Sequence, residues 1–251
     1  MKYPFCFFAL LGSFIVVLSG CSGSDDDNVA PPEVPPTIFS FTPTPGSTNN
    51  EFNIVGNPTI NGDQYEFNAV DEDNGCGLQG GDHIILDTLE AIWENGFSMY
   101  AWVEFTENRN FERIFDFGNG RGEDNGQNVS LARYKTTSGL ALTSWLDSTV
   151  ANRVDGRVIA FNAIVNNQKA FYAATISPTG EMKLYINGEV AAQRADGHPV
   201  ANVRRTRNFI GHSNWCHIDP DFKGTIEGLN IFNRVISEEL IKAVYDEGLG
   251  E

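Results

Sequence analysis

The stretch from residue 212 to residue 221 holds the best ligand-binding candidate in the sequence. Trp215 follows Asn214 there, and Asp219 and Asp221 come shortly after. An aromatic face can stack on the apolar face of a sugar ring, while amide and carboxylate groups hydrogen-bond its hydroxyls. These residues therefore predict a glycan site with Trp215 as its platform.

Other aromatic residues fall where a β-strand can present them to a sugar. The alternative is that they pack in the core or in a second layer, as most aromatic residues on sandwich strands do. A basic cluster is suited either to an acidic glycan or to pairing with nearby acids. The aromatic candidates are Trp145, Tyr134, Trp102 and Tyr100, and the basic ones are Arg204, Arg205 and Arg207.

The elements that must position these residues are β-strands, because hydrophobic residues alternate with polar ones over most of the chain. Phe97 to Phe105 alternates most regularly, which turns Phe97 toward a core and Tyr100 and Trp102 away from it. Asn187 and Gly188 follow a second alternating run and predict a tight hairpin. Further strands are predicted at 65–70, 83–88, 113–117, 128–134, 140–145, 158–164, 170–176, 182–186, 207–211 and 222–233.

One helix is predicted, after Ser237, whose hydroxyl can cap the free amides of the first turn. Glu238 and Glu239 suit the positive end of that helix, and Gly248 ends it. Many short strands with regular turns predict an all-β fold, a two-sheet antiparallel jelly-roll sandwich with a short C-terminal helix.

Length and charge limit the remaining possibilities. The 251 residues carry a net charge of −16, which argues against nucleic acid as a partner. The size suits one all-β domain plus a linker. We therefore divide the chain into a signal peptide (1–20), an acidic and Pro-rich linker (21–50) and the jelly-roll domain (51–251).

The first residues predict export. An apolar run ends in Leu18-Ser19-Gly20 before Cys21, which resembles a bacterial lipobox, so Cys21 is the predicted lipidation site. The three aspartates at 25–27 resemble a surface-export signal and predict a lipid-anchored, surface-exposed protein of the outer membrane. The alternative for this acidic segment is a plain solvated spacer.

Two cysteines remain in the domain. Cys76 and Cys216 are predicted to form a disulfide, because two cysteines in an exported protein usually pair. The alternative is two separate buried thiols. No pair of cysteines has the spacing of a zinc site.

Several segments in order resemble the laminin-G-like (LamG) jelly rolls of the concanavalin A-like lectin and glucanase superfamily. The resemblance covers about residues 52 to 246 and implies the sandwich fold. Its segments are Phe97-Ser98-Met99-Tyr100-Ala101-Trp102-Val103, Arg113-Ile114-Phe115-Asp116-Phe117-Gly118, Met182-Lys183-Leu184-Tyr185-Ile186-Asn187-Gly188, Phe209-Ile210-Gly211-His212-Ser213, Phe222-Lys223-Gly224-Thr225-Ile226 and Ile231-Phe232-Asn233-Arg234.

The resemblance also implies that the loops at 116–125 and 212–221 meet at one face and can hold calcium. Calcium prefers carboxylate, amide and carbonyl oxygens, whereas acidic loops are otherwise simply solvated. Without a bulge at Gly228, Glu227 would point inward and need a partner, which is either a calcium ion, a salt bridge or a backbone amide that it caps. The implied calcium ligands are Asp124, Asn125, Asp219, Asp221 and Glu227, with Asp124 and Asn125 also near the glycan.

Catalysis is not expected. The related glucanases carry Glu-x-Asp-x-x-Glu on one strand, and the related lyases carry Gln-x-His, and neither string occurs here. The sequence therefore predicts a non-catalytic carbohydrate-binding or adhesion module on the bacterial surface, with a glycan or a cell-surface protein as partner and contact with the membrane through the lipid anchor alone. The alternatives are a structural or protein-interaction component of an outer-membrane assembly, or a divergent polysaccharide-active enzyme.

Overall fold

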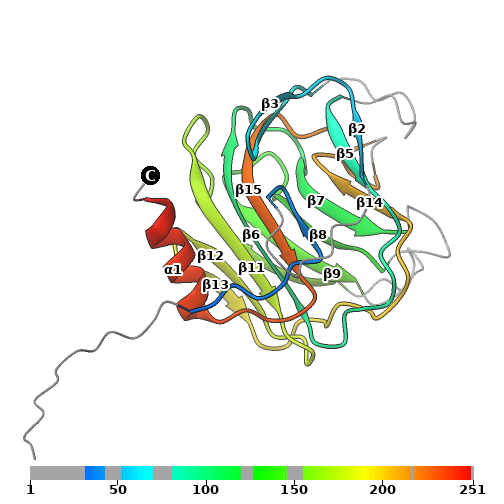
Figure 1. The fold of residues 1–251 in the computed structure, drawn as a ribbon, viewed down its shortest axis with the longest axis vertical. Coiled ribbons are helices and arrows are strands. Elements are labelled where there is room, and N and C mark those ends of the chain that lie inside the picture. The colour runs from blue at the N-terminus through cyan, green and yellow to red at the C-terminus, as the bar shows by residue number, and fades with distance from the viewer. Residues whose placement is uncertain are drawn as a thin grey trace, which may run out of the picture. The chain divides into compact units, whose positions relative to one another are not determined.

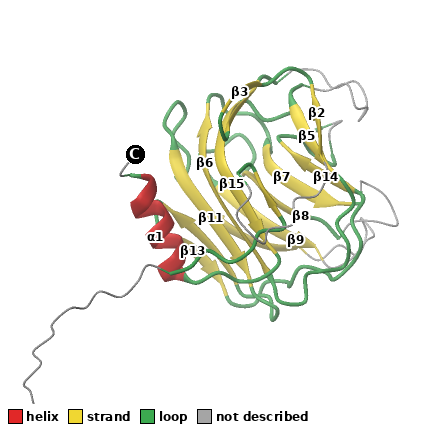
Figure 2. Ribbon diagram, viewed as in Figure 1, coloured by secondary structure: helices red, strands yellow, loops and turns green. Residues whose placement is uncertain are grey.

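The computed structural model describes residues 32–42, 52–69, 81–119, 127–145, 155–215 and 218–249. Within these ranges the chain forms two antiparallel sheets and one C-terminal helix (Figures 1 and 2). The all-β sandwich predicted from the alternation of hydrophobic residues is confirmed.

The first sheet has eight strands in the order β13-β12-β11-β6-β15-β4-β3, with β1 also paired to β15. Its central pair, β6 and β15, is long and runs antiparallel with a register shift between Glu227 and Asn230. The strands are β1 (Phe39–Ser40), β3 (Thr59–Asn61), β4 (Gln64–Phe67), β6 (Phe97–Phe105), β11 (Ala170–Ile176), β12 (Met182–Ile186), β13 (Glu189–Arg194) and β15 (Gly224–Phe232).

The second sheet has seven strands in the order β10-β9-β8-β7-β14-β5-β2. It carries, on its outer face, the pocket described below. Its strands are β2 (Phe52–Val55), β5 (His83–Leu86), β7 (Arg113–Gly118), β8 (Val129–Arg133), β9 (Leu140–Trp145), β10 (Asp155–Ala160) and β14 (Arg207–Ile210).

The main core lies between the inner faces of the two sheets. Phe97, Met99 and Val103 of β6 face Phe115 and Leu131 of the other sheet within one buried cluster. Each of these side chains is fully buried. Strand alternation therefore predicted the core face of β6 correctly, because successive side chains of a strand point to opposite faces.

Helix α1 (Glu238–Gly248) covers the outer face of the eight-stranded sheet. Leu240 and Ile241 of the helix share a second buried cluster with Tyr100 and Phe171 of the sheet. The predicted cap is confirmed, since the amide of Leu240 donates to the Ser237 hydroxyl at 3.2 Å.

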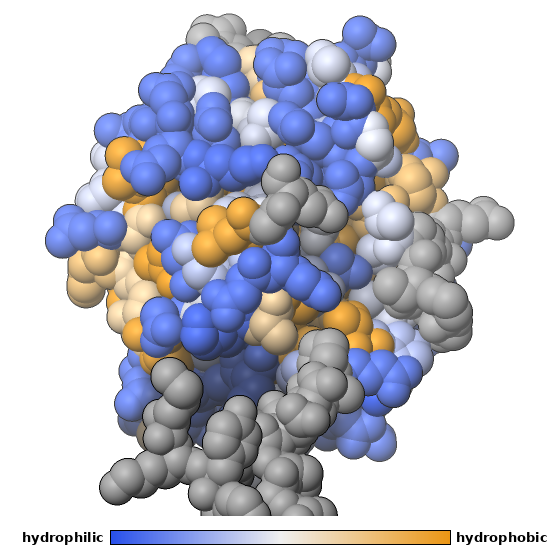
Figure 3. Space-filling view, turned by 60° about the vertical axis from the view of Figure 1, so that its left-hand side comes forward, coloured by the Kyte–Doolittle hydropathy of each residue, from blue (hydrophilic) through white to orange (hydrophobic). Residues whose placement is uncertain are grey.

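The surface drawn in Figure 3 is mostly hydrophilic, with small and separate hydrophobic patches.

The predicted hairpin at Asn187 and Gly188 is confirmed. Both residues have positive φ, 51° and 80°, and they connect β12 to β13. Two consecutive left-handed residues are what a tight type I′ hairpin requires, and Asn-Gly provides them at the lowest cost.

Several observed boundaries differ from the predicted ones. β1 lies within the stretch assigned to the linker, and Phe39 is fully buried and pairs with Ile231. The folded part thus begins before residue 51, because Ile38, Phe39 and Phe41, which lie between two prolines, pack into or against the core. β10 ends at Ala160 rather than at Ile164. The short strands β2, β3 and β13 were not predicted, and most of their side chains are exposed. Cys21 and the signal segment lie outside the described residues.

Candidate functional site

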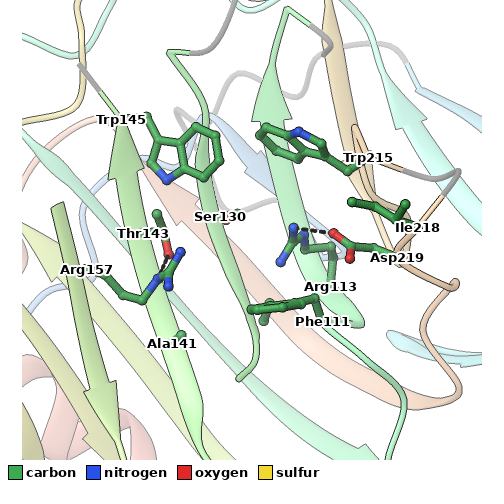
Figure 4. A pocket seen from close by; sticks show the side chains of 11 residues that line it. Phe111, Arg113, Ser130, Ala141, Thr143, Trp145, Arg157, Trp215, Ile218 and Asp219 are labelled. Carbon is green, nitrogen blue, oxygen red and sulfur yellow. Dashed lines mark hydrogen bonds and ion pairs between the residues drawn. The ribbon is translucent and has the colours of Figure 1, made fainter. Parts of the chain in front are cut away.

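A cavity of about 290 Å³ opens on the outer face of the seven-stranded sheet (Figure 4). Its floor consists of small side chains from β8 and β9, where Ser130 pairs with Thr143 and Ala132 pairs with Ala141. Larger residues at these four outward positions would fill the hollow. The cross-strand register therefore creates the pocket.

Two tryptophans form one end of this pocket. Trp145, at the end of β9, and Trp215, in the loop after β14, lie with ring centroids 4.6 Å apart and planes tilted by 55°. Both were predicted from the sequence as sugar-binding residues, and the structure brings them together. Trp215 is only 8% exposed, however, so it forms a wall of the pocket rather than the projecting platform that the sequence suggested.

Arg113 and Ile218 lie on the same side of the pocket as Trp215, and Phe111 lies at the end away from the two tryptophans (Figure 4). Arg113 Nη2 donates to Asp219 at 2.8 Å, and its Nε lies 3.4 Å from Asp116. Its guanidinium carbon is 5.7 Å from the centre of the Phe111 ring and 5.8 Å from that of Trp215. These contacts fix the Arg113 side chain against the aromatic walls.

Arg157 of β10 lines the remaining side of the pocket. Its Nε donates to the Thr143 hydroxyl at 3.2 Å, and its guanidinium carbon lies 5.7 Å from the centre of the Tyr134 ring. Tyr134, a predicted sugar-binding residue, is half-buried and does not itself line the cavity. No ligand-binding role was predicted for Arg113, Arg157 or Phe111; Arg113 was matched only as the first residue of a strand segment.

Asn214 is buried and forms hydrogen bonds with Asp116 of β7. It is 1% exposed, its backbone amide donates to Asp116 Oδ2 at 3.0 Å, and its side-chain amide donates to Asp116 Oδ1 at 3.1 Å. It therefore holds the loop that carries Trp215 against β7. Asn214 was predicted to contact the ligand directly, but its side chain is turned away into this hydrogen-bonded pair.

Asp219 is the single acidic side chain among the described residues that line the pocket. Burial raises the pKa of its carboxyl to about 6, even though Arg113 opposes the shift; the neighbouring Asp116 adds to it. Its Oδ2 also accepts a hydrogen bond from the Ser213 hydroxyl at 3.3 Å. The predicted calcium ligand Asp219 is therefore already engaged by an arginine and a hydroxyl.

Asp221 belongs to a separate buried cluster. Its Oδ1 lies 2.5 Å from His212 Nδ1, and its Oδ2 accepts a hydrogen bond from the amide of Gly81. The His212 ring stacks on His83 with centroids 4.4 Å apart and planes 18° apart. The sequence reasoning found no role for these histidines, because only the fold brings them together.

The His83, His212 and Asp221 group is the one set of three potential metal-binding side chains found among the described residues. Ring-nitrogen lone pairs lie in the imidazole planes, so two nearly parallel stacked rings do not direct them at a common point. The cluster instead ties the start of β5 to the loop that follows β14. We assign it a structural role.

Glu227 lies on the opposite sheet and points outward. Gly228 has a φ of 59°, and the register of β15 shifts there, so that Ile226 and Leu229 are buried while Glu227 is half-buried beside the helix-bearing face. Its carboxylate is 2.9 Å from Lys169 Nζ. The inward orientation depended on the absence of a bulge at Gly228; the bulge is present and reverses the alternation, so Glu227 points outward. The salt bridge, one of the alternatives to calcium, is present.

The other predicted calcium ligands, Asp124 and Asn125, lie outside the described residues, as do Cys76 and Cys216 of the predicted disulfide. Asp219, Asp221 and Glu227 do not form a common group within the described ranges. Calcium binding and the disulfide remain predictions.

Two arginines of the basic cluster are engaged by partners within the protein. Arg205 is fully buried and donates to the backbone carbonyls of Gln127 and Ala201 at 2.8 and 2.9 Å. Burial lowers the pKa of Arg205 to about 9. Arg204 pairs with Glu90 at 3.2 Å on the surface. Arg205 therefore stabilises the backbone of two loops, and the pairing alternative applies to Arg204.

Among the described residues, no helix has the length and hydrophobicity needed to cross a membrane.

Comparison with known proteins identifies the family to which the fold is similar. The family model of laminin-G type, described as the concanavalin A-like lectin/glucanases superfamily, matches residues 78–242. A search of curated proteins gives no significant match.

Several solved structures share the fold. The receptor-binding domain of botulinum neurotoxin C/D mosaic serotype matches with a TM-score of 0.55 and 20% identity over 79% of this chain and 46% of that one. The botulinum neurotoxin serotype D ligand-binding domain in complex with N-acetylneuraminic acid matches with a TM-score of 0.53 and 18% identity over 79% and 46%. The Ruminococcus gnavus sialidase module CBM40, bound to α2,3-sialyllactose, matches with a TM-score of 0.50 and 17% identity over 60% and 83%. The matches to the neurotoxin domains thus cover about half of their length.

Proposed function

Because the chain belongs to the concanavalin A-like lectin/glucanases superfamily, we propose that it is a carbohydrate-binding module whose ligand occupies the pocket on the seven-stranded sheet. The observation that carries this proposal is the convergence of Trp145, Trp215 and Arg157 on one small cavity. Apolar walls suit the C–H face of a sugar, and guanidinium groups suit its oxygen atoms.

The pocket is better suited to binding than to hydrolysis. Glycoside hydrolysis ordinarily uses two carboxyl groups that flank the scissile bond, whereas Asp219 is the single acid in the described lining and is paired with Arg113. The Arg113 and Asp219 pair instead holds the wall of the pocket in place. A preformed wall reduces the ordering cost of binding a ligand.

The sequence supports a place for this module at the cell surface. In the proposal, Cys21 carries the lipid anchor and the segment after it holds the domain away from the outer membrane. Such display gives the pocket access to extracellular glycans. Mass spectrometry of the N-terminal peptide from membranes tests the anchor, and an unmodified Cys21 in exported protein contradicts it.

A glycan array tests the binding function, with N-acetylneuraminic acid and sialyllactose among the first probes because two fold neighbours are complexes with such sugars. We expect Trp215→Ala to weaken binding by about 10-fold or more, which corresponds to about 1.4 kcal/mol. Trp102→Ala is the matched control, because this tryptophan, also an aromatic candidate from the sequence, contacts Tyr245 of helix α1 on the other sheet and does not line the pocket. Adding EDTA in a parallel array tests whether calcium is required.

Two results would contradict the proposal. The first is equal glycan affinity in the wild type and Trp215→Ala, with the variant shown to be folded. The second is the absence of any glycan signal together with specific capture of a neighbouring membrane protein, which would favour the protein-interaction alternative.

A further inference from the structure

Three aromatic side chains lead away from the pocket along one end of the seven-stranded sheet. Phe111 lines the pocket, Tyr134 follows β8, and Phe161 follows β10. The ring centroids of Phe111 and Tyr134 are 6.0 Å apart, and those of Tyr134 and Phe161 are 6.5 Å apart. We call these three residues the aromatic row.

The outer member of this row is open to solvent. Phe161 is 71% exposed, the largest value among the exposed large hydrophobic side chains of the described residues. Single exposed hydrophobic residues are common on protein surfaces. Phe161 differs because its ring continues, through Tyr134, a line of aromatic contacts that begins inside a pocket.

Backbone conformation along the row is unusual. Phe111 has a φ of 53°, in the left-handed region that bulky side chains rarely adopt. Lys135 and Asn162, each next in sequence to a member of the row, also have positive φ, 56° and 57°. Such residues persist only where surrounding contacts hold them, and they concentrate at functional sites.

Those surrounding contacts converge on one buried arginine. Arg133 is fully buried, and its Nε donates to Glu112 at 2.6 Å. Its Nη2 donates to the Glu107 carbonyl at 2.7 Å and to Asn166 Oδ1 at 2.8 Å, while its Nη1 donates to the Thr137 carbonyl at 2.9 Å. One guanidinium thereby ties together the three loops that carry Phe111, Tyr134 and Phe161.

Polar and cationic groups accompany the row. Lys135 Nζ lies 5.3 Å from the centre of the Tyr134 ring, and the Arg157 guanidinium carbon lies 5.7 Å from it. Lys135 is exposed. Rings flanked by hydrogen-bond donors suit a sugar chain better than they suit a purely apolar ligand, because each sugar unit presents both C–H faces and hydroxyl groups.

We infer that the aromatic row continues the binding site, so that the ligand is an oligosaccharide rather than a single sugar. One unit occupies the pocket beside Trp145 and Trp215, the next contacts Phe111 and Tyr134, and a further unit contacts Phe161. Neighbouring rings of the row lie edge to face, with planes 88° and 89° apart, so each ring presents its own surface to a different sugar unit. The inference rests on the proposed function and specifies the ligand class for that same site.

Isothermal titration with homologous oligosaccharides, from monosaccharide to hexasaccharide, tests this inference. The probes are manno-, xylo-, gluco- and N-acetylglucosamine oligomers, together with N-acetylneuraminic acid and its lactose conjugate. We expect wild-type affinity to rise with chain length. In Phe161→Ala we expect a loss of about 3- to 10-fold for the longer probes alone, the size of one aromatic contact. Affinity for the single sugar should stay unchanged.

Val165→Ala is the matched control, because this residue is 58% exposed in the same loop and is aliphatic rather than aromatic. It should bind every probe as the wild type does. Equal affinities in Phe161→Ala and the wild type at all chain lengths, with Trp215→Ala still impaired, would overturn the aromatic row and leave the proposed function intact. Absence of binding to every probe would overturn both.

Discussion

The outer faces of the two sheets carry similar residues and are used differently. On the eight-stranded sheet Tyr100 and Phe171 lie beneath helix α1 in a closed cluster with Leu240. On the seven-stranded sheet Trp145 and Trp215 lie around an open cavity. Aromatic residues at outward strand positions therefore do not by themselves indicate a binding site.

The difference is set by what surrounds the aromatic rings. The covered face has a helix whose apolar residues complete the cluster. The open face has a floor of alanine, serine and threonine, and no helix among the described residues lies over it. A hollow thus forms where small residues pair across strands and no element fills the space.

The predicted disulfide is expected to have the largest effect on the difference between the open face and the helix-covered face. If Cys76 and Cys216 are bonded, the loop after Trp215 is covalently fixed, whereas the covered face depends on helix packing alone. A disulfide that closes the loop between residues 76 and 216 contributes about 4 to 5 kcal/mol to the free energy of unfolding in the chain-entropy model, less any native strain. Mass spectrometry of exported protein should find no alkylatable thiol in the domain. Two alkylatable thiols would contradict the predicted disulfide.

Phe171→Ala tests the covered face. This side chain is fully buried in the helix cluster, so its truncation should lower the free energy of unfolding by about 3 to 5 kcal/mol. Glycan affinity of the folded fraction should be unchanged, because the pocket lies on the other sheet. Denaturant unfolding and titration on the same sample measure both quantities. A comparable loss of glycan affinity would mean that the two faces are coupled.

The pH dependence of stability separates the faces further. Burial raises the pKa of Asp219 in the open face to about 6, from an ordinary value of 3.8. In the covered face burial raises the pKa of Tyr100 to about 12. Because the folded state holds the Asp219 proton more tightly, the stability that this carboxyl contributes is present below its ordinary pKa and is lost as pH rises through about 6.

We therefore expect the unfolding free energy of the wild type to fall between about pH 4 and pH 6, by on the order of 2 to 3 kcal/mol relative to Asp219→Asn. The variant is the reference because the other carboxyls titrate in both proteins. Urea unfolding at a series of pH values gives the two curves. Parallel curves would mean that Asp219 titrates near its ordinary value.

Local pattern alone determined much of the scaffold. The bounds of β6, β9, β11 and β12, the Asn187-Gly188 hairpin and the Ser237 cap were all predicted correctly. Each depends on neighbours in sequence, through side-chain alternation in strands, positive φ at a turn, or one hydroxyl at a helix start. The matching family segments follow the same elements.

The tertiary structure decided the site. Trp145 and Trp215 were predicted as separate candidates, and only strand pairing placed them 4.6 Å apart. Arg113 and Arg157 were not predicted, because the functional position of an isolated arginine depends on which face its strand presents.

Orientation was likewise beyond the sequence. One bulge at Gly228 turned Glu227 outward, and buried partners turned Asp219 toward Arg113 and Asp221 toward His212. Sequence determines which groups the chain carries and which strands it forms, because those choices are local. Pairing register, bulges and buried partners determine which groups meet, because they depend on residues far apart in the chain.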